Sequence, residues 1–377
     1  MNRRKICYVT GTRADFGLMR SALNKIHIAP SLELQLLVTG MHLADRFGET
    51  VSEIEASGFP VSARVGCQFQ DFTGAEMAKN IGRMLIGFVD AMQTSRPDTV
   101  IVLGDRGEML AATIAAVHLR IPVVHLHGGE RSGTVDEPVR HAISKFANWH
   151  LVATDESMHR LVKMGERADR IKVIGAPGLD GLIEAASVGR SDICRDFGFD
   201  EKMPIALYLF HPTMHDAFAP QVMARNLMEA LLESKHQVIA LMPNSDAGSE
   251  EVAAYLQGLH GRGSVKVMKH LERHRFVSAM SVADIMVGNS SSGIIEAASF
   301  GTPVLNVGCR QNLRQRNSNV TDCDGDRSRL SAVVAQISGK RFSRTNCYGD
   351  GMAGSRVVDF LLTADFSQNV VDKCNAY

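Results

Sequence analysis

Residues 6–17 read ICYVTGTRADFG, a short apolar run that ends in glycine, threonine, arginine and aspartate. A run of apolar residues this short, closed by a glycine turn, is typical of a strand buried on both faces of a parallel sheet. In such sheets the polar residues just after the strand lie where ligands bind. The rest of the chain repeats this pattern, and the repetition predicts the fold.

Short apolar strands alternate with helical patterns over all 377 residues. This alternation predicts parallel sheets covered by helices, and the chain is too long for a single core. We therefore predict an α/β protein with two Rossmann-like, doubly wound domains that face a cleft, at residues 1–180 and 181–377. A helix at 355–362 could pack back on the first domain. The predicted strands are 6–9, 34–38, 99–103, 123–126, 151–153, 171–174, 205–209, 238–241, 265–268, 285–287 and 304–307.

The composition excludes several classes of protein. The 41 basic side chains balance 41 acidic ones, which argues against a general nucleic-acid binder or a polybasic membrane binder. The first apolar run, of about six residues, is shorter than a secretory signal requires, and we expect cytoplasmic residence. Seven scattered cysteines contain no C-x-x-C pair, which predicts neither a disulfide framework nor a zinc site.

The segment 289–293 reads NSSSG and lies between a predicted strand and an apolar helix at 294–300. Hydroxyl side chains before a helix, together with free backbone N–H groups and the helix dipole, favour a phosphate or pyrophosphate. An ordinary helix N-cap is the alternative. Glu296, within that helix, could accept hydrogen bonds from ribose hydroxyls or could merely complement the dipole.

Two arginines follow the first and the last clear strands. The guanidinium groups of Arg13 and Arg310 suit a diphosphate, although either could be a solvated surface charge. His211 stands at a strand end that Pro212 terminates, and it could donate to a phosphate oxygen. The first loop lacks the spacing G-x-G-x-x-G, and no Walker pattern occurs, so we predict no NAD, ATP or other cofactor.

Acids and histidines concentrate in the middle of the first half. Acidic and imidazole groups at neighbouring strand ends suit proton transfer to and from carbon or oxygen. The residues concerned are Asp105 and Arg106 after one strand, His127 and Glu130 after the next, and Asp136 at the start of the helix that follows.

Two alternative interpretations apply to this segment. His125 and His127 have the H-x-H spacing of metal ligands, but no compact set of acids or cysteines completes a site, so we predict no metal. Asp136 and Arg140 are four residues apart and could form an ordinary ion pair on the surface of a helix.

Taken together, these motifs resemble the hydrolysing UDP-N-acetylglucosamine 2-epimerases, the family that opens bacterial and animal sialic-acid synthesis. The resemblance implies two Rossmann-like domains in the glycosyltransferase-B arrangement, with the active site between them. The matching stretches are TGTRADFG at 10–17, GDR at 104–106, HGGERSGTVDEPVRHAISK at 127–145, FHP at 210–212, PNSDAGS at 243–249, VGNSSSGIIE at 287–296 and GTPVLNVGCRQ at 301–311.

The resemblance also implies the reaction. The substrate is a UDP-linked 2-acetamido sugar, in the first place UDP-N-acetylglucosamine, and the products are UDP and free N-acetylmannosamine. The route is anti elimination of UDP followed by syn addition of water. A small-molecule substrate, no nucleic acid, no membrane and a homodimer or homotetramer are the partners implied.

Roles for individual residues follow from the same resemblance. The UDP-binding set is Arg13, His211, Asn244, Lys269, Ser290, Ser291, Glu296 and Arg310. Asp105 and Asp136 match catalytic acids, and His127 and Glu130 complete the catalytic candidates. His42 and Arg106 are similar to positions on the sugar side.

One position departs from the family pattern. Many members carry glutamate where this chain has His127, in the pattern H-x-E-G-G-E. A related branch that acts on UDP-N,N'-diacetylbacillosamine, the UDP-2,4-diacetamido-2,4,6-trideoxy sugar on the way to legionaminic acid, is therefore the alternative substrate assignment. The general base stays open among Asp105, Asp136 and His127.

Three further classes of function are compatible with this fold. They are a UDP-sugar glycosyltransferase, a non-hydrolysing epimerase whose sugar stays attached to UDP, and a non-catalytic sugar-nucleotide sensor.

Overall fold

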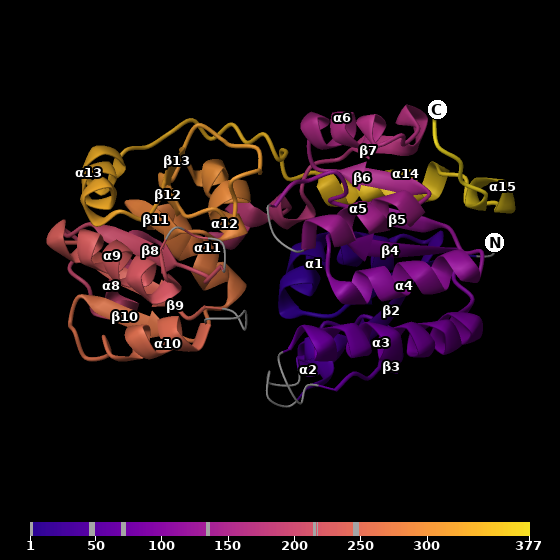
Figure 1. Cartoon of the computed structure of the whole chain (residues 1–377), viewed down its shortest axis with the longest axis horizontal. Coiled ribbons are helices and arrows are strands. Elements are labelled where there is room, and N and C mark those ends of the chain that lie inside the picture. The colour runs from indigo at the N-terminus through magenta and orange to yellow at the C-terminus, as the bar shows by residue number, and fades with distance from the viewer. Residues whose placement is uncertain are drawn as a thin grey trace. The chain divides into compact units, whose positions relative to one another are not determined.

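The computed structural model describes residues 3–44, 50–68, 73–132, 136–213, 216, 218–243 and 249–377. The chain divides into two compact units (Figure 1). Unit 1 comprises Met1–Asp180 and Tyr348–Tyr377, and unit 2 comprises Gly181–Cys347. Each unit contains one parallel sheet with helices on its faces, so the predicted fold class of two Rossmann-like α/β domains is confirmed.

The sheet of unit 1 has the strand order β3-β2-β1-β4-β5-β6-β7, and all its pairings are parallel. The chain winds outward from β1 to β3 and then returns to place β4 on the other side of β1. The switch point of the sheet, where such folds bind ligands, is therefore between β1 and β4. The strands are β1 (Arg4–Thr10), β2 (Leu32–Thr39), β3 (Val61–Val65), β4 (Thr99–Leu103), β5 (Val123–Leu126), β6 (Trp149–Val152) and β7 (Ile171–Val173).

Both faces of this sheet are covered, which explains the continuous apolar run of β1. Ile6 and Tyr8 pack against α1 and α14, whereas Cys7 and Val9 face α3, α4 and α5. The helices of unit 1 are α1 (Arg13–Ile28), α2 (Val51–Ala56), α3 (Gly74–Ser95), α4 (Gly107–His118), α5 (Asp136–Phe146), α6 (Asp155–Lys163), α14 (Ala353–Thr363) and α15 (Gln368–Val371). Short 3₁₀ turns lie at Gly40–Leu43, Ala168–Arg170 and Pro177–Leu179.

The C-terminal segment belongs to unit 1, and Figure 1 shows α14 and α15 in yellow among its purple elements. The carboxylate of Asp180 accepts hydrogen bonds of 2.8 Å from the backbone N–H groups of Ala353 and Gly354, at the start of α14. An acid at a helix N-terminus stabilises it by satisfying unpaired N–H groups. Asp180 thus ties the end of the first segment to α14.

A buried carboxylate holds the last residues of the chain. Glu166 accepts hydrogen bonds from Lys145 Nζ at 2.7 Å, His150 Nε2 at 3.0 Å and Lys373 Nζ at 2.5 Å. Burial by itself would raise the pKa of Glu166, but these three donors together lower it to about 2. Lys373 also donates to the carbonyl oxygens of Ser144 and Ala147, so the cluster joins the C-terminus to α5.

We expect Glu166→Gln to lower the free energy of unfolding by about 2 kcal/mol, below the range for a fully buried pair because Lys145 is 38% exposed. Since the folded-state pKa is depressed, the contribution of Glu166 is complete above the ordinary value of 4.5 and disappears as the pH falls toward 2. Urea denaturation at pH 7 and pH 3 measures this. Equal differences between wild type and variant at both pH values contradict it.

The sheet of unit 2 has the order β10-β9-β8-β11-β12-β13 and is also parallel throughout, with its switch point between β8 and β11. Its strands are β8 (Ile205–Leu209), β9 (Gln237–Leu241), β10 (Val265–Met268), β11 (Ile285–Gly288), β12 (Val304–Val307) and β13 (Val320–Cys323). The sequence analysis missed β3 and β13. Both are edge strands with partly exposed side chains, so their sequences lack an apolar run.

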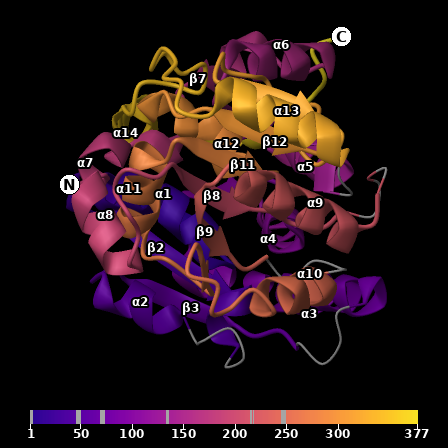
Figure 2. The ribbon, with the colours of Figure 1, turned by 90° about the vertical axis from the view of Figure 1, so that its left-hand side faces the viewer.

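Helices α9 and α13 pack on one face of the unit 2 sheet and lie next to each other in Figure 2. The helices of this unit are α7 (Leu182–Ala185), α8 (Arg190–Phe197), α9 (Pro220–Glu233), α10 (Ser249–Gln257), α11 (Arg273–Val282), α12 (Ser291–Ile295) and α13 (Arg327–Ile337). The helix predicted at 294–300 is interrupted, because α12 ends at Ile295 and a 3₁₀ turn follows at Ala297–Phe300. Among the described residues, no helix has both the length and the hydropathy that a bilayer crossing requires.

Candidate functional site

The carboxyl ends of the parallel strands in unit 1 bring the predicted residues of this unit to one edge of the sheet. Arg13 follows β1, Asp105 and Arg106 follow β4, and His127 and Glu130 follow β5. Asp136 is the first residue of α5. Since β1, β4 and β5 are neighbours, these side chains gather at the switch point.

A buried arginine links two of the predicted acids. Arg140 on α5, with 2% of its side chain exposed, forms an ion pair with Asp105, and its Nη1 lies 3.9 Å from Glu130 Oε2. A guanidinium between two carboxylates favours their ionised forms. Arg140 thus joins two candidate acids from the loops after β4 and β5. The i, i+4 spacing indicates only an ion pair with Asp136 on the surface of the helix.

His127 and Glu130 form a close pair within the loop after β5. Nδ1 of His127 donates to Glu130 Oε1, and the two side chains are 13% and 5% exposed. The loop turns sharply, because His127 has φ of +60° and its backbone N–H donates to the Leu151 carbonyl at 3.2 Å. Histidine tolerates this left-handed conformation better than most side chains do.

The turn continues at Gly129, where the geometry requires glycine. Its φ is +74°, and a Cβ there would lie 2.4 Å from the carbonyl oxygen of Ser157. Gly128, beside it, packs against the ring of His125. The glycine pair therefore lets the loop fold back so that Glu130 reaches His127.

The buried ring of His125 contacts Gly104 in the loop after β4 and Ser144 on α5. Its Nε2 donates to the Gly104 carbonyl at 2.8 Å, so Nδ1 accepts from Ser144 Oγ at 3.0 Å. Complete burial lowers the pKa of His125 to about 3, which keeps the ring neutral. The ring thereby holds the backbone of Gly104, the residue before Asp105, and both of its nitrogens are bonded within the protein.

A carboxylate of the protein, that of Asp15, binds the backbone N–H groups just before α1. The Asp15 carboxylate accepts from the backbone N–H groups of Gly11 at 3.1 Å and Thr12 at 2.8 Å, and from Thr10 Oγ1. Burial raises the pKa of Asp15 to about 6, against the lowering effect of these donors. The N–H groups that bind a phosphate in dinucleotide-binding folds are therefore occupied by a side chain of the protein itself.

His42 differs from the predicted sugar contact in its surroundings. It is fully buried, and its ring nitrogens lie 3.0 Å from Thr10 Oγ1 and 2.6 Å from Thr50 Oγ1. Burial lowers the pKa of His42 to about 4, so the ring is neutral at physiological pH. In the structure, His42 bonds the side chain of Thr10 at the end of β1. Its contact with a sugar stays a prediction.

Arg13 and Arg106 keep partly exposed guanidinium groups at this edge. Arg13 pairs with Glu53, and Arg106 Nε lies 2.7 Å from Glu108 Oε1. The charge of Glu108, followed by those of Asp15 and Asp136, raises the pKa of the Arg106 guanidinium, although burial opposes it. Asp136 is therefore close enough to Arg106 for the two charges to interact.

In unit 2, one buried asparagine connects three strand ends. The side chain of Asn289 accepts from the backbone N–H of His211 and donates to its carbonyl, both at 2.7 Å. The carbonyl oxygen of Asn289 accepts from Arg310 Nη1 and from Gln311 Nε2, each at 3.1 Å. Asn289 thus connects His211 after β8 with Arg310 after β12, next to the switch point of the second sheet.

The serine segment begins the short helix α12. Ser290 is the N-cap, and its hydroxyl bonds with Ser292 Oγ at 2.8 Å. Glu296 lies where α12 ends rather than one turn inside a longer helix, and Arg273 Nη1 contacts its Oε2 at 2.7 Å. Burial raises the pKa of Glu296, and Arg273 opposes this. Ser291 is partly exposed at the first helical position.

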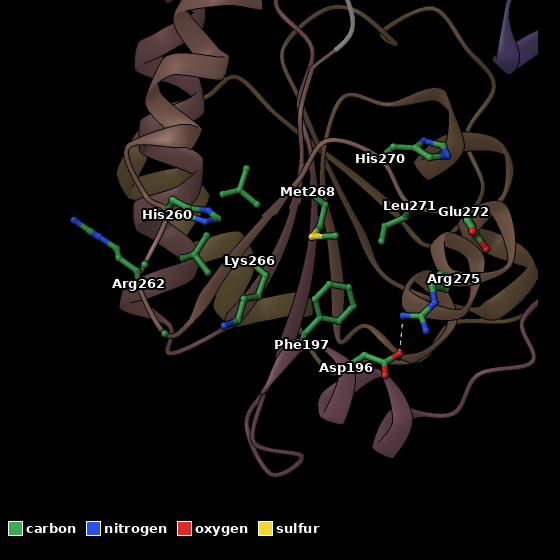
Figure 3. A pocket seen from close by; sticks show the side chains of 14 residues that line it. Asp196, Phe197, His260, Arg262, Lys266, Met268, His270, Leu271, Glu272 and Arg275 are labelled. Atoms are coloured by element: carbon green, nitrogen blue, oxygen red, sulfur yellow. Dashed lines mark ion pairs between the residues drawn. The ribbon is translucent and has the colours of Figure 1, made fainter. Parts of the chain in front are cut away.

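The two remaining UDP-binding candidates are Lys269 and Asn244. Lys269 is exposed directly after β10, and Asn244 lies outside the described residues. Residues on both sides of Lys269 line a cavity of about 560 Å³ along β10, shown in Figure 3. Arg275 and Asp196 pair across this cavity at 2.7 Å. In the described ranges, three or more His, Cys, Asp or Glu residues nowhere cluster in a way that could hold a metal ion.

The sequence analysis did not include Arg140 and Asn289 among the candidate site residues, although the structure places both in contact with candidates. A signal for Arg140 was present, because it shares its helix face with the buried residues Ile143, Ser144 and Ala147. An arginine on a buried face requires acidic partners. Asn289 begins the predicted phosphate-binding segment, but no local pattern indicates that its side chain bonds the backbone of His211, 78 positions away in the chain.

Comparison with known proteins identifies the family. A family model described as UDP-N-acetylglucosamine 2-epimerase matches residues 24–362. The UDP-N,N'-diacetylbacillosamine 2-epimerase (hydrolyzing) of Legionella pneumophila is 44% identical over 375 residues, which cover 99% of this chain and 100% of that protein. The chain belongs to the UDP-N-acetylglucosamine 2-epimerase family. It is accordingly an enzyme, a UDP-sugar 2-epimerase, as the resemblance implied.

Other epimerases of the family agree with this assignment. The UDP-N-acetylglucosamine 2-epimerase of Neisseria meningitidis is 34% identical over 88% of this chain and 87% of its own. A crystal structure of UDP-GlcNAc 2-epimerase from Neisseria meningitidis bound to UDP-GlcNAc superposes with a TM-score of 0.80, at 19% identity, over 96% of this chain and 100% of the other. The epimerase fold of this chain is thus shared with a solved family member.

Proposed function

We propose that this epimerase hydrolyses UDP-N,N'-diacetylbacillosamine, releasing UDP and the free 2-epimeric sugar. The observation that carries the proposal is the 44% identity to the Legionella pneumophila enzyme of that name over the full length of both chains. A Campylobacter jejuni GDP/UDP-N,N'-diacetylbacillosamine 2-epimerase (hydrolyzing), 31% identical over 91% of this chain, supports it. The imidazole of His127 in place of a carboxylate is consistent with a sugar whose polar groups differ from those of N-acetylglucosamine.

The chemistry of the substrate explains why cations and acids are both needed. The hydrogen on C2 of the sugar is not next to a carbonyl group, so it becomes acidic only as the bond between C1 and the phosphate oxygen breaks. Cations must stabilise the departing diphosphate, and carboxylates must stabilise the positive charge that develops on the ring. We assign the first task to His211 and Arg310 with the serine segment of unit 2, and the second to the acids of unit 1.

UDP-N-acetylglucosamine is the second candidate substrate. The 34% identity to the UDP-N-acetylglucosamine 2-epimerase of Neisseria meningitidis favours it. The two substrates differ at C4 and C6 of the sugar, and their elimination at C1 and C2 is the same. The proposed reaction therefore does not depend on which of them is correct.

Incubation with each UDP-sugar, without an acceptor, tests the proposal. We expect one UDP per free sugar, and proton NMR of the anomeric signals should show the 2-epimer. The specificity constant should be at least about tenfold higher for the diacetamido substrate, since a pocket built to bond a polar group discriminates against its absence. A higher value for UDP-N-acetylglucosamine contradicts the substrate assignment.

The same assay separates the other classes of function. A sugar that is epimerised but stays attached to UDP identifies a non-hydrolysing epimerase. UDP release that requires an added acceptor identifies a glycosyltransferase. Binding of the UDP-sugar with no turnover identifies a sensor.

A further inference from the structure

We infer that His127 is the base that removes the C2 proton in this enzyme, and that Glu130 positions its ring, as a histidine–carboxylate dyad. The inference deepens the proposed function and rests on it. It starts from the contact between His127 Nδ1 and Glu130 Oε1, which lie three residues apart in the loop after β5.

The contact fixes which ring nitrogen can accept a proton. A carboxylate oxygen only accepts hydrogen bonds when ionised, so Nδ1 of His127 carries the hydrogen. The neutral ring therefore has its lone pair on Nε2. Within the described part of the chain, the ring of His127 makes its one hydrogen bond through Nδ1, and 13% of the side chain is exposed. Nε2 is thus the nitrogen available to a substrate.

The surroundings hold the dyad in place from behind. Glu130 uses Oε1 for His127, while its Oε2 faces Arg140 Nη1 at 3.9 Å. Arg140 in turn pairs with Asp105. A row of alternating charge therefore runs from His127 through Glu130 and Arg140 to Asp105. Arg140 keeps the Glu130 carboxylate ionised, and the ionised carboxylate stabilises the imidazolium that forms when Nε2 takes a proton.

The backbone supports the same role. His127 has φ of +60°, a conformation that costs about 1 kcal/mol or more for a residue with a side chain. The backbone N–H of His127 is held by the Leu151 carbonyl, and Gly129 closes the turn behind it. The strained turn therefore fixes the direction of the His127 side chain. Backbone strain of this kind is common where reacting groups are positioned.

The elimination step balances with His127 as the acceptor. Nε2 takes the C2 proton, the C2–H electron pair forms the C1–C2 double bond, and the pair of the C1–O bond leaves with the diphosphate of UDP. The imidazolium then releases its proton to solvent, which matches the proton that hydrolysis of a UDP-sugar to UDP yields overall. Addition of water to the double bond consumes no further proton from His127.

His127→Asn tests the role of the base. Asparagine accepts positive φ readily, so the turn is preserved while the base is removed. We expect kcat to fall by about 10²–10⁴-fold with little change in UDP affinity. A substrate deuterated at C2 should show a larger isotope effect in the variant than in wild type, because proton removal becomes slower. His159→Asn, at an exposed histidine on α6 of the same unit, should retain wild-type kinetics.

Glu130→Gln tests the positioning role by a measurement that a purely structural role does not move. Without the carboxylate, the tautomer and the orientation of the His127 ring are no longer fixed, so kcat should fall at least about tenfold with little change in KM, and Glu130→Asp should recover part of that loss. Glu130→Gln also decides the question if His127→Asn does not fold. A kcat of Glu130→Gln near wild type, or His127→Asn with a kcat near wild type, overturns the dyad. A wild-type protein that releases no UDP overturns the proposed function, and the dyad with it.

Discussion

Asp105→Asn is expected to lower kcat by about 10²–10³-fold while UDP binding is retained. Asp105 is held against the buried Arg140, with 20% of its side chain exposed, so it is ionised and fixed in place. With proton removal assigned to His127, its carboxylate is left to stabilise the positive charge on the sugar ring. Asparagine keeps the size of the side chain and a hydrogen-bond acceptor for Arg140, and only the charge is lost.

The measurement is steady-state release of UDP, with UDP affinity determined separately by calorimetry. Asp359→Asn, at an exposed position on α14 in the same unit, is the matched control and should behave as wild type. A variant at Asp105 that turns over at the wild-type rate removes this residue from the catalytic set. A loss of UDP affinity with unchanged kcat assigns it to binding instead.

Asn289→Leu is expected to weaken UDP binding by about 10- to 100-fold and to lower the free energy of unfolding by about 2 kcal/mol. Leucine has a similar size but cannot bond the N–H and carbonyl groups of His211, each of which Asn289 holds at 2.7 Å. Both backbone groups then lose a buried partner. The bonds of Arg310 and Gln311 to the backbone carbonyl of residue 289 are kept, so the variant removes only the side-chain bonds to His211.

Titration with UDP and urea denaturation measure the two effects. Asn312→Leu changes an exposed asparagine of unit 2 in the same way and should leave UDP affinity unchanged. If UDP affinity survives in Asn289→Leu while stability falls, Asn289 supports the fold but not the binding site. If neither changes, the bonds to His211 have no energetic importance.

Much of the fold could be predicted because it depends on local pattern. Residues 6–9 of β1 and 205–209 of β8 are apolar at every position, since helices cover both faces of each sheet. The edge strands β3 and β13 keep partly exposed side chains, so their sequences do not show a continuous apolar run. The break in the predicted helix at Glu296 was also missed, because the residues before and after it are helix-compatible in sequence.

The sequence predicted where the candidate residues lie relative to the strands, but it did not predict which residues they contact. Polar residues after β1, β4, β5, β8 and β11 could be recognised as strand-end residues without any structure. Their neighbours could not, because Arg140 is 35 positions from Asp105 and Asn289 is 78 positions from His211 in the chain. His42 was assigned to the sugar side by resemblance, and only its burial shows that its ring nitrogens face threonines.

The amino-acid sequence by itself determined the strands that are buried on both faces, the loops that carry polar residues, and the family. Each of these depends on residues that are close together along the chain, where the repeat of strand and helix governs the pattern. The tertiary structure alone decided which distant groups are paired: Asp105 with Arg140, Glu166 with Lys373, and Asn289 with the backbone of His211. Such pairs form only when packing brings separate segments together and excludes water from between them.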